Sequence, residues 1–218
     1  MEALEEEIER VGFLPLFAGG VPGFSVEERT ASAHWWSDDP RIDPWIWREI
    51  VAGRGRIAYG KFFGGRAGFF SLRWFPRLCN WRRDGYDFDA RWDEGLAPVR
   101  AKRIMDLFSH GEERFSFEAK REAGFGKDGE KNFEGTVTSL MMQTYLVMRD
   151  FRRRRNRAGL PYGWHIAVYA APESVWGYDL VTSAYPEKPE DSRDALYGQL
   201  LRVCPGASEE EVRALLGR

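Results

Sequence analysis

Apolar residues recur at helical spacing in three consecutive segments near the middle of the chain. Residues 96–108 place Val99, Ile104 and Leu107 on one face, with basic residues between them. A short second helix is expected to begin after Ser116, whose hydroxyl can cap free amides, and to end at Gly124. Residues 131–143 repeat the helical pattern. The pattern therefore predicts three helices in succession.

After the third helix the apolar period changes to two. Residues 144–152 and residues 164–170 alternate and are rich in β-branched and aromatic side chains, which is typical of strands. The segment between them is basic and contains asparagine, glycine and proline, which favour turns. Three helices followed by a hairpin is the order of a winged helix. We predict an α+β fold, mainly helical with small antiparallel sheets, containing a winged helix-turn-helix module over residues 96–175.

The two flanking parts are less regular. Residues 1–95 are expected to form an N-terminal α/β region, in which Asp43 caps a helix that starts at Pro44. Residues 176–218 are expected to form an acidic helical tail. In that tail Ser192 and Ser208 are predicted helix caps, the latter with Glu211 in a capping box.

Composition restricts the class of protein. With 43% hydrophobic and 15% aromatic residues among 218, the chain can bury a sizeable core. No apolar run approaches the roughly 20 residues that cross a bilayer, and the first residues are acidic, so a cytoplasmic location is expected. Cys79 and Cys204 are the only cysteines, too few for a disulfide framework or the usual zinc sites. The acids of residues 84–94 lack calcium-loop spacing, so neither a metal nor a cofactor is predicted.

The charge is uneven along a chain whose formal net charge is −2. Residues 97–165 contain 14 basic and 9 acidic residues, a local net charge of +5. Such an island can attract an anionic polymer, because salt screens the distant acids within roughly 8 to 10 Å. A solvated surface is the alternative interpretation. The candidate DNA-binding residues are Arg152, Arg153, Arg154, Arg155 and Arg157 of the hairpin, with Lys127 and Lys131 before the third helix.

Residues 34–49 are the most unusual segment by composition. They contain four tryptophans, Trp35, Trp36, Trp45 and Trp47. These side chains are either part of the core, where tryptophan is commonly buried, or the lining of a pocket for a planar ligand such as an extruded base. Both interpretations remain open from the sequence.

Residues 59–83, YGKFFGGRAGFFSLRWFPRLCNWRR, resemble a stretch of the AlkZ/YcaQ-type DNA glycosylases that reads roughly FEYWxHxASLLPxxxxPLxRWR. Comparable positions are filled by Phe62, Phe63, Ala67, Phe69, Phe70, Pro76, Leu78, Trp81 and Arg82. The predicted winged helix resembles the module that follows in that family, so the resemblance spans about residues 11–175. It implies a DNA-repair protein whose partner is double-stranded DNA, including damaged DNA.

The residues that the resemblance assigns to base excision are missing. The family's Gln-apolar-Asp or Gln-apolar-Gln triplet falls on Pro15, Leu16 and Phe17, and its histidine falls on Gly65. None of these side chains can orient a water molecule toward the sugar carbon. The resemblance therefore implies the scaffold of the family without its usual catalytic groups.

Three functions follow from these observations. We favour a DNA-binding relative of the alkylation- and crosslink-repair glycosylases that lacks their usual catalytic residues. The first alternative is a glycosylase with relocated catalytic residues, for which Asp38, Asp39 and Asp43 are the candidates beside the tryptophans. The second is a winged helix used for protein contact, because a fold does not determine a function.

Overall fold

The computed structural model describes residues 1–217. It contains two three-stranded antiparallel sheets and predominantly helical connections, so the α+β prediction is confirmed. The helices are α1 (Glu2–Val11), α2 (Pro44–Arg54), α3 (Phe75–Arg83), α4 (Phe88–Asp93), α5 (Val99–Met105), α6 (Ser116–Glu122), α7 (Phe133–Met142), α8 (Pro172–Trp176), α9 (Tyr178–Val181), α10 (Pro189–Val203) and α11 (Glu209–Leu216). The strands are β1 (Phe13–Pro15), β2 (Ile57–Phe63), β3 (Arg66–Ser71), β4 (Arg114–Phe115), β5 (Val147–Arg155) and β6 (Pro161–Ala170). Short 3₁₀ turns occur at Glu27–Arg29, Ser32–His34 and Asp106–Phe108.

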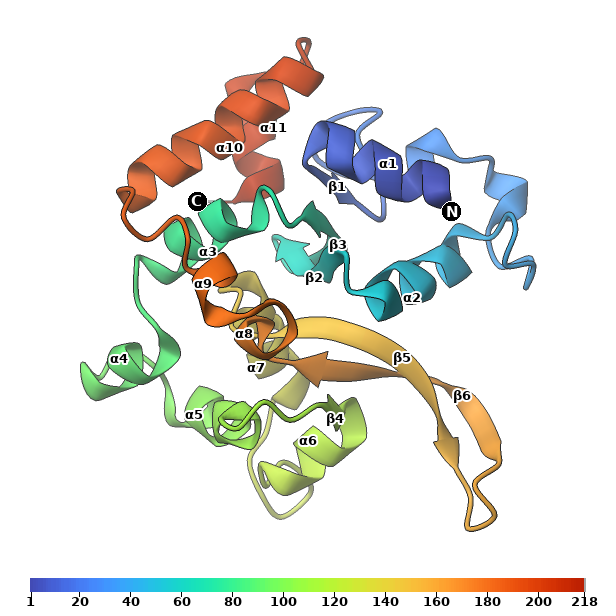
Figure 1. The fold of residues 1–218 in the computed structure, drawn as a ribbon, viewed down its shortest axis with the longest axis vertical. Helices are drawn as coiled ribbons and strands as arrows, with labels where there is room; N and C mark the ends of the chain where they lie inside the picture. Colours follow the sequence, from blue (N-terminus) through green and yellow to red (C-terminus); the bar gives the residue numbers. More distant parts are fainter. Residues whose placement is uncertain (218) are drawn as a thin grey trace.

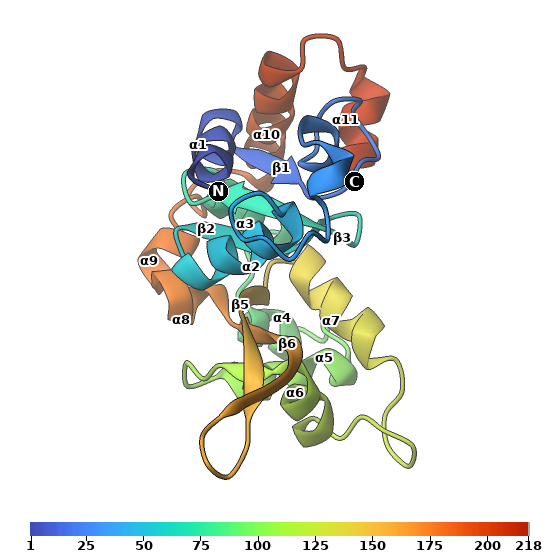
Figure 2. The ribbon, with the colours of Figure 1, turned by 90° about the vertical axis from the view of Figure 1, so that its right-hand side faces the viewer.

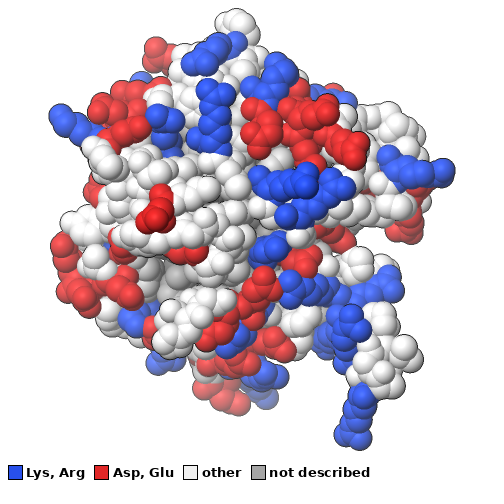
Figure 3. Space-filling model, in the orientation of Figure 1, with Lys and Arg blue, Asp and Glu red and all other residues white. Residues whose placement is uncertain are grey.

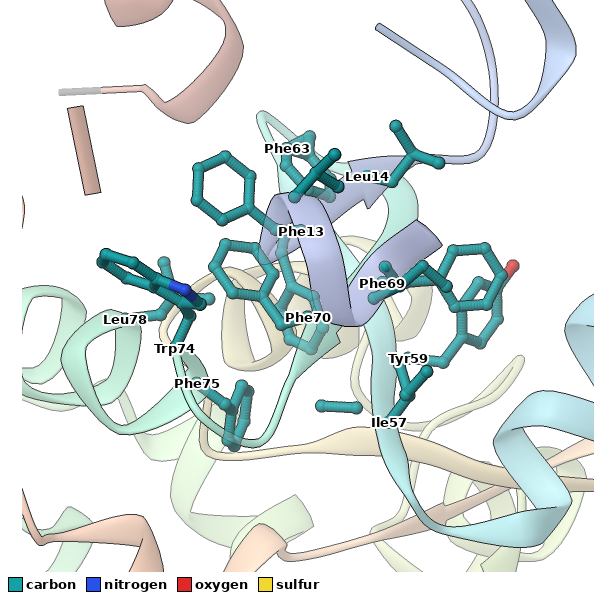
Figure 4. Close-up of a cluster of buried hydrophobic side chains, with 14 of the residues drawn as sticks. Phe13, Leu14, Ile57, Tyr59, Phe63, Phe69, Phe70, Trp74, Phe75 and Leu78 are labelled. Atoms are coloured by element: carbon teal, nitrogen blue, oxygen red, sulfur yellow. The ribbon is translucent and has the colours of Figure 1, made fainter. Parts of the chain in front are cut away.

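The first sheet has the strand order β1-β3-β2 and lies inside the larger hydrophobic cluster. Phe13 stacks on Phe70 at a centroid distance of 4.8 Å, and Phe63 stacks on Phe70 at 5.5 Å, so one ring from each strand meets at the centre (Figure 4). Gly64 and Gly65 join β2 to β3 with φ of +59° and +84°. A two-residue hairpin turn of this kind needs two positive φ angles, which glycine adopts without strain.

The second sheet has the order β4-β6-β5 and covers a smaller cluster formed with α4, α5, α6 and α7. In Figures 1 and 2 the first sheet and the helices α4–α7 lie toward opposite ends of the molecule, and the β5–β6 hairpin projects from the second end. The elements of this end follow in the order α5, β4, α6, α7, β5, β6. The three predicted helices and the hairpin are present, and β4 is an additional strand of two residues.

Two predicted details of the second end are wrong. Ser116 does not cap α6 but is its first residue, because Phe115 belongs to β4 and is paired with Val168. The side chain of Glu118 accepts a hydrogen bond from the Phe115 amide at 3.4 Å and so serves the start of the helix instead. The second correction is that Arg153–Arg155, which were expected in the turn segment, lie within strand β5, because pairing of the arms continues from Arg155 to Pro161.

The C-terminal helices α10 and α11 pack into the first cluster beside α1 and α3 (Figures 1 and 2). Leu196, Leu200 and Leu215 are fully buried there. The predicted capping box at the start of α11 is confirmed, since Ser208 accepts a hydrogen bond from the Glu211 amide at 3.2 Å.

Ser192, however, is not a helix cap. It lies inside α10, which begins at Pro189, and its hydroxyl is fully buried. That hydroxyl accepts a hydrogen bond from Asn80 at 3.0 Å and donates one to Glu187 at 3.1 Å. Ser192 therefore attaches α10 to α3. Among the helices of residues 1–217, none has the length and apolar character needed to cross a bilayer.

Arg83, at the end of α3, joins the two ends of the molecule. Its guanidinium is only 1% exposed and donates to the Thr144 carbonyl at 2.8 Å and to Glu173 at 2.5 Å. It also lies 4.7 Å from the centre of the Tyr145 ring. Burial alone would lower the pKa of Arg83, but nearby Glu173 and Tyr185 outweigh that effect, so the pKa is raised and the charge is retained.

Replacing Arg83 by alanine should strongly destabilise the fold. The change leaves the Thr144 carbonyl and the Glu173 carboxylate without their partner, and breaking a buried ion pair costs about 3 to 5 kcal/mol. Urea unfolding measures the loss. Arg77→Ala is the matched control, because its ion pair with Glu187 is partly solvated and should be worth less than about 1 kcal/mol. Equal losses in the two variants would contradict the role given to Arg83.

Candidate nucleic-acid interface

Four arginines of the β5–β6 hairpin, Arg152–Arg155, lie on β5, which is paired with β6. Its loop, residues 156–160, is closed by Asn156, whose amide donates to the Leu160 carbonyl at 3.0 Å. The Asn156 side-chain oxygen also accepts from the amides of Ala158 and Leu160, at 2.9 Å and 3.0 Å. Arg152–Arg155 precede this loop and are all exposed. The spacing of these charges is therefore set by strand geometry.

The five hairpin arginines differ in how far they are already engaged. Arg152 is paired with Glu113 at 2.6 Å and with Asp150 at 2.5 Å. Burial acts to lower the pKa of Arg152, but these two carboxylates outweigh it, and the pKa is raised. Arg152 is therefore partly neutralised by its own protein.

The other four arginines have more freedom to meet an anion. The Arg154 guanidinium lies over the ring of Phe117, 4.1 Å from its centre, and Arg155 donates to the Gly159 carbonyl at 2.8 Å. Within residues 1–217, Arg153 and Arg157 make no ion pair. Four cations of the hairpin thus lack a carboxylate partner in the described part of the chain, and a phosphate would supply one.

A hollow of about 640 Å³ lies beside these arginines. It is lined by Phe115, Arg152, Arg153, Arg155, Pro161 and His165. Figure 3 shows Lys and Arg side chains gathered along the hairpin at the lower right, below a notch in the outline of the molecule. The hollow therefore brings three of the predicted DNA-binding residues together around one concave surface.

Lys127 and Lys131 lie on the loop between α6 and α7. Lys131 donates to the Gly126 carbonyl at 2.7 Å and to the Lys127 carbonyl, so its ammonium helps to close the loop. Lys127 is exposed. Both views of the ribbon place this loop and the hairpin tip at the same end of the molecule (Figures 1 and 2).

The base of the hairpin is held against α2. Arg149 donates to the carbonyls of Ala52 and Gly53 at 3.0 Å and 2.9 Å, which satisfies the free end of that helix. Phe151 packs near Tyr59 of β2, with ring centres 6.1 Å apart. The hairpin therefore projects from a fixed base toward its cationic end.

Sequence reasoning missed a group of charged side chains at this junction. Arg48 lies 3.5 Å from the centre of the Trp45 ring and 4.2 Å from that of Phe151, and burial lowers its pKa. Glu49 accepts from Arg48 at 3.1 Å and also contacts the ring nitrogen of His165 on β6. The composition of α2 gave no signal for this arrangement, because His165 is 116 residues away from Glu49.

The four tryptophans do not share one environment. Trp35 is 8% exposed and donates its indole N–H to Thr30 at 2.9 Å, whereas Trp36 is 64% exposed and has φ of +59°. Trp45 and Trp47 are half-buried, and Trp47 donates to the Pro40 carbonyl at 3.1 Å. Trp35 is a core residue, Trp45 and Trp47 pack against the core, and Trp36 is mostly in solvent.

Two of the three candidate carboxylates are engaged in local structure. Asp43 caps α2 as predicted, accepting from the Trp45 amide at 2.8 Å and from the Asp38 amide at 3.2 Å. Asp39 binds the Arg41 side chain at 2.6 Å, which lowers the pKa of Asp39 to about 2. Asp38 has φ of +58°. These contacts account for Asp39 and Asp43 without a catalytic role.

The residues onto which the resemblance places the catalytic triplet lie in or beside the core. Pro15 and Leu16 are buried, and Phe17 packs against Trp35 with ring centres 5.4 Å apart. Gly65 lies in the β2–β3 turn, and its positive φ disfavours a larger residue. Among residues 1–217, no group of three or more histidine, cysteine or acidic side chains is arranged to hold a metal ion.

A family model described as AlkZ related matches residues 1–217. Neither the curated proteins nor the solved structures gave a match to this chain.

Replacing Trp35 by alanine should cost about 3 to 5 kcal/mol of unfolding free energy, as is usual for a buried aromatic residue. Replacing Trp36 by alanine should cost less than about 1 kcal/mol, because that side chain is mostly in solvent. Thermal or urea unfolding measures both. A strongly destabilised Trp36→Ala variant would show that the exposed ring supports the core.

Proposed function

Because the chain belongs to the AlkZ-related family, we propose that it binds duplex DNA through phosphate groups along the β5–β6 hairpin. The observation that carries the proposal is the hollow lined by Arg152, Arg153 and Arg155. Arginine binds phosphate through two parallel N–H groups, which favours it for such contacts. Lys127, exposed on the α6–α7 loop at the same end of the molecule, is a further candidate for a phosphate contact.

The arrangement of the second end supports a winged-helix assignment for residues 96–175. A helix, a short strand, two helices and a two-stranded hairpin follow in that order, and the short strand β4 pairs with β6. In helix-turn-helix proteins the recognition helix enters the major groove. Here that helix would be α7.

The residues of α7 argue against a strong groove contact. Its sequence, FEGTVTSLMM, contains no basic residue and includes Glu134. Thr138 accepts a hydrogen bond from Lys61 of β2 at 3.0 Å. We therefore assign the phosphate contacts to the hairpin and the α6–α7 loop. Little sequence preference is expected, because phosphates are the same at every base.

We propose further that the protein does not cleave glycosidic bonds by the usual chemistry of its relatives. Leu16 and Phe17 occupy the expected triplet as packed apolar side chains. An apolar side chain cannot accept a proton from water or stabilise the positive charge that develops on the sugar. Binding without excision is the function that these residues support best.

Changing Arg153, Arg155 and Arg157 together to alanine should weaken duplex binding at least tenfold near 0.1 M salt. The slope of the logarithm of affinity against the logarithm of salt concentration should also become shallower, by about 0.9 for each phosphate that the variant no longer neutralises. Fluorescence anisotropy with a labelled duplex at several salt concentrations measures both quantities.

The matched control changes Arg41, Arg202 and Arg213, which are exposed arginines outside the hairpin, to alanine. It removes the same charge and should leave the salt dependence nearly unaltered. Equal losses of duplex affinity in the two triple variants would show that the hairpin arginines act only through the net charge of the protein. Absence of binding by the unaltered protein even at low salt would favour the alternative of a protein-contact module.

A second candidate function is base excision with a relocated carboxylate. The observation that favours it is Glu49, which lies where α2 meets the hairpin and contacts both Arg48 and His165. In that role Glu49 would accept a proton from the water that attacks the sugar carbon as the base departs. Glu49 is preferred to Asp38, Asp39 and Asp43, the candidates from the sequence, because it contacts His165 of the hairpin directly.

This second candidate predicts release of a methylated base from alkylated duplex DNA. Glu49→Gln should then reduce the rate at least 100-fold, because the amide cannot act as a base. Asp39→Asn is the control and should leave the rate within about twofold. Chromatography of the released base measures it, and a wild-type rate equal to that of protein-free DNA would eliminate excision.

A further inference from the structure

Three apolar side chains project from the outer half of the hairpin. The exposed fractions are 62% for Leu160, 49% for Tyr162 and 91% for Trp164. Tryptophan is usually well buried, because its ring removes a large apolar area from water. An indole that is almost fully in solvent, close in sequence to two more exposed apolar side chains, is a candidate interaction surface.

The backbone around Trp164 departs from regular strand pairing. Arg152 is paired with Ile166 and Arg154 with Tyr162, so a single residue of β5, Arg153, faces three residues of β6. Trp164 is the middle residue of those three. A bulge of this kind changes the direction of the side chains within it.

Gly163 makes this bulge possible. Its φ is +74°, and a Cβ at Gly163 would have no neighbour within 4 Å, so the constraint is conformational rather than steric. The exposed position of Trp164 is thus built into the backbone of β6.

The side chains opposite the bulge are cationic. Arg153 faces the three-residue segment, and Arg154 pairs directly with Tyr162. Cationic groups that follow a nucleic-acid backbone, combined with aromatic rings on which bases stack, are the usual elements of recognition of unpaired nucleotides. The arginines and the rings occur here on one narrow ribbon.

We propose that Trp164 stacks on an unpaired nucleobase while the arginines of β5 hold the adjacent phosphates, so that the protein prefers duplex DNA containing an extrahelical base to intact duplex. This inference rests on the proposed DNA contact of the same hairpin. An unpaired base is required because the bases of an intact duplex stack on each other. Unstacking them costs free energy, whereas an extrahelical base is already unstacked.

The size of the expected preference follows from the strength of stacking. Stacking of one base on an aromatic side chain changes affinity by roughly 5- to 150-fold. Because Trp164 is mostly in solvent, its side chain must be ordered on binding, which costs free energy. We therefore expect a preference of about tenfold, in the lower part of that range.

The test compares two labelled duplexes of the same sequence, one intact and one with a single extrahelical 2-aminopurine at its centre. Fluorescence anisotropy gives both affinities, and quenching of 2-aminopurine reports stacking. The wild-type protein should bind the second duplex about tenfold more tightly and quench its fluorescence. Trp164→Ala should lower that ratio to about one while changing affinity for the intact duplex less than twofold.

Two further variants complete the comparison. Trp164→Phe should recover part of the preference, because phenylalanine retains a stacking ring. Trp36→Ala removes another exposed tryptophan, 64% exposed and outside the hairpin, and should leave the preference unaltered. Unfolding midpoints of all variants should agree with the wild type, since both tryptophan side chains are mainly in solvent.

The outcomes separate this inference from the proposed function. Equal affinity of the wild type for both duplexes, or a preference that survives Trp164→Ala, overturns the stacking inference and leaves phosphate binding standing. Failure to bind either duplex at low salt overturns both. An anionic membrane is the alternative partner for exposed arginines and a tryptophan, and sedimentation with vesicles containing phosphatidylserine tests it. Trp164-dependent vesicle binding without DNA binding would identify the hairpin as a membrane contact and overturn the inference.

Discussion

Burial of the Arg83 guanidinium is the constraint on which the arrangement of this protein depends. A charge that is removed from water must be paired and hydrogen-bonded, or its desolvation destabilises the fold by several kcal/mol. Arg83 meets that requirement with groups on both sides of it, the Thr144 carbonyl before β5 and Glu173 on α8. A single side chain of α3 therefore links the first cluster to the beginning of the hairpin and to α8.

The orientation of the hairpin is set by contacts between its base and α2. Arg149 closes the end of α2, and Arg48 is enclosed between Trp45 and Phe151, so the root of the hairpin is held by both polar and aromatic contacts. Its outer half has exposed arginines and exposed apolar rings instead. These features suit the proposed contact with an extended anionic partner, because the base of the hairpin is already held in place before the partner docks.

The local features of the candidate interface could largely be predicted from the sequence. The change of apolar period from helical to two identified the helices before the hairpin and the hairpin itself. Asp43 and the Ser208–Glu211 pair were identified as caps because capping involves residues close in sequence. The β2–β3 hairpin was missed, although Gly64 and Gly65 between two apolar segments are a recognised turn signal.

Other features had no local signal. Ser192 has the composition of a cap but serves as a buried contact to Asn80, and the partnership of Glu49 with His165 joins residues that only folding brings together. The exposure of Trp164 depends on the register of β5 against β6, which a hydrophobic pattern does not contain. The helices before the hairpin, the hairpin and its basic charge follow from contacts between near neighbours, so they could be predicted from the sequence. Which charges remain available to a partner could not, because pairing and burial depend on residues distant in the chain.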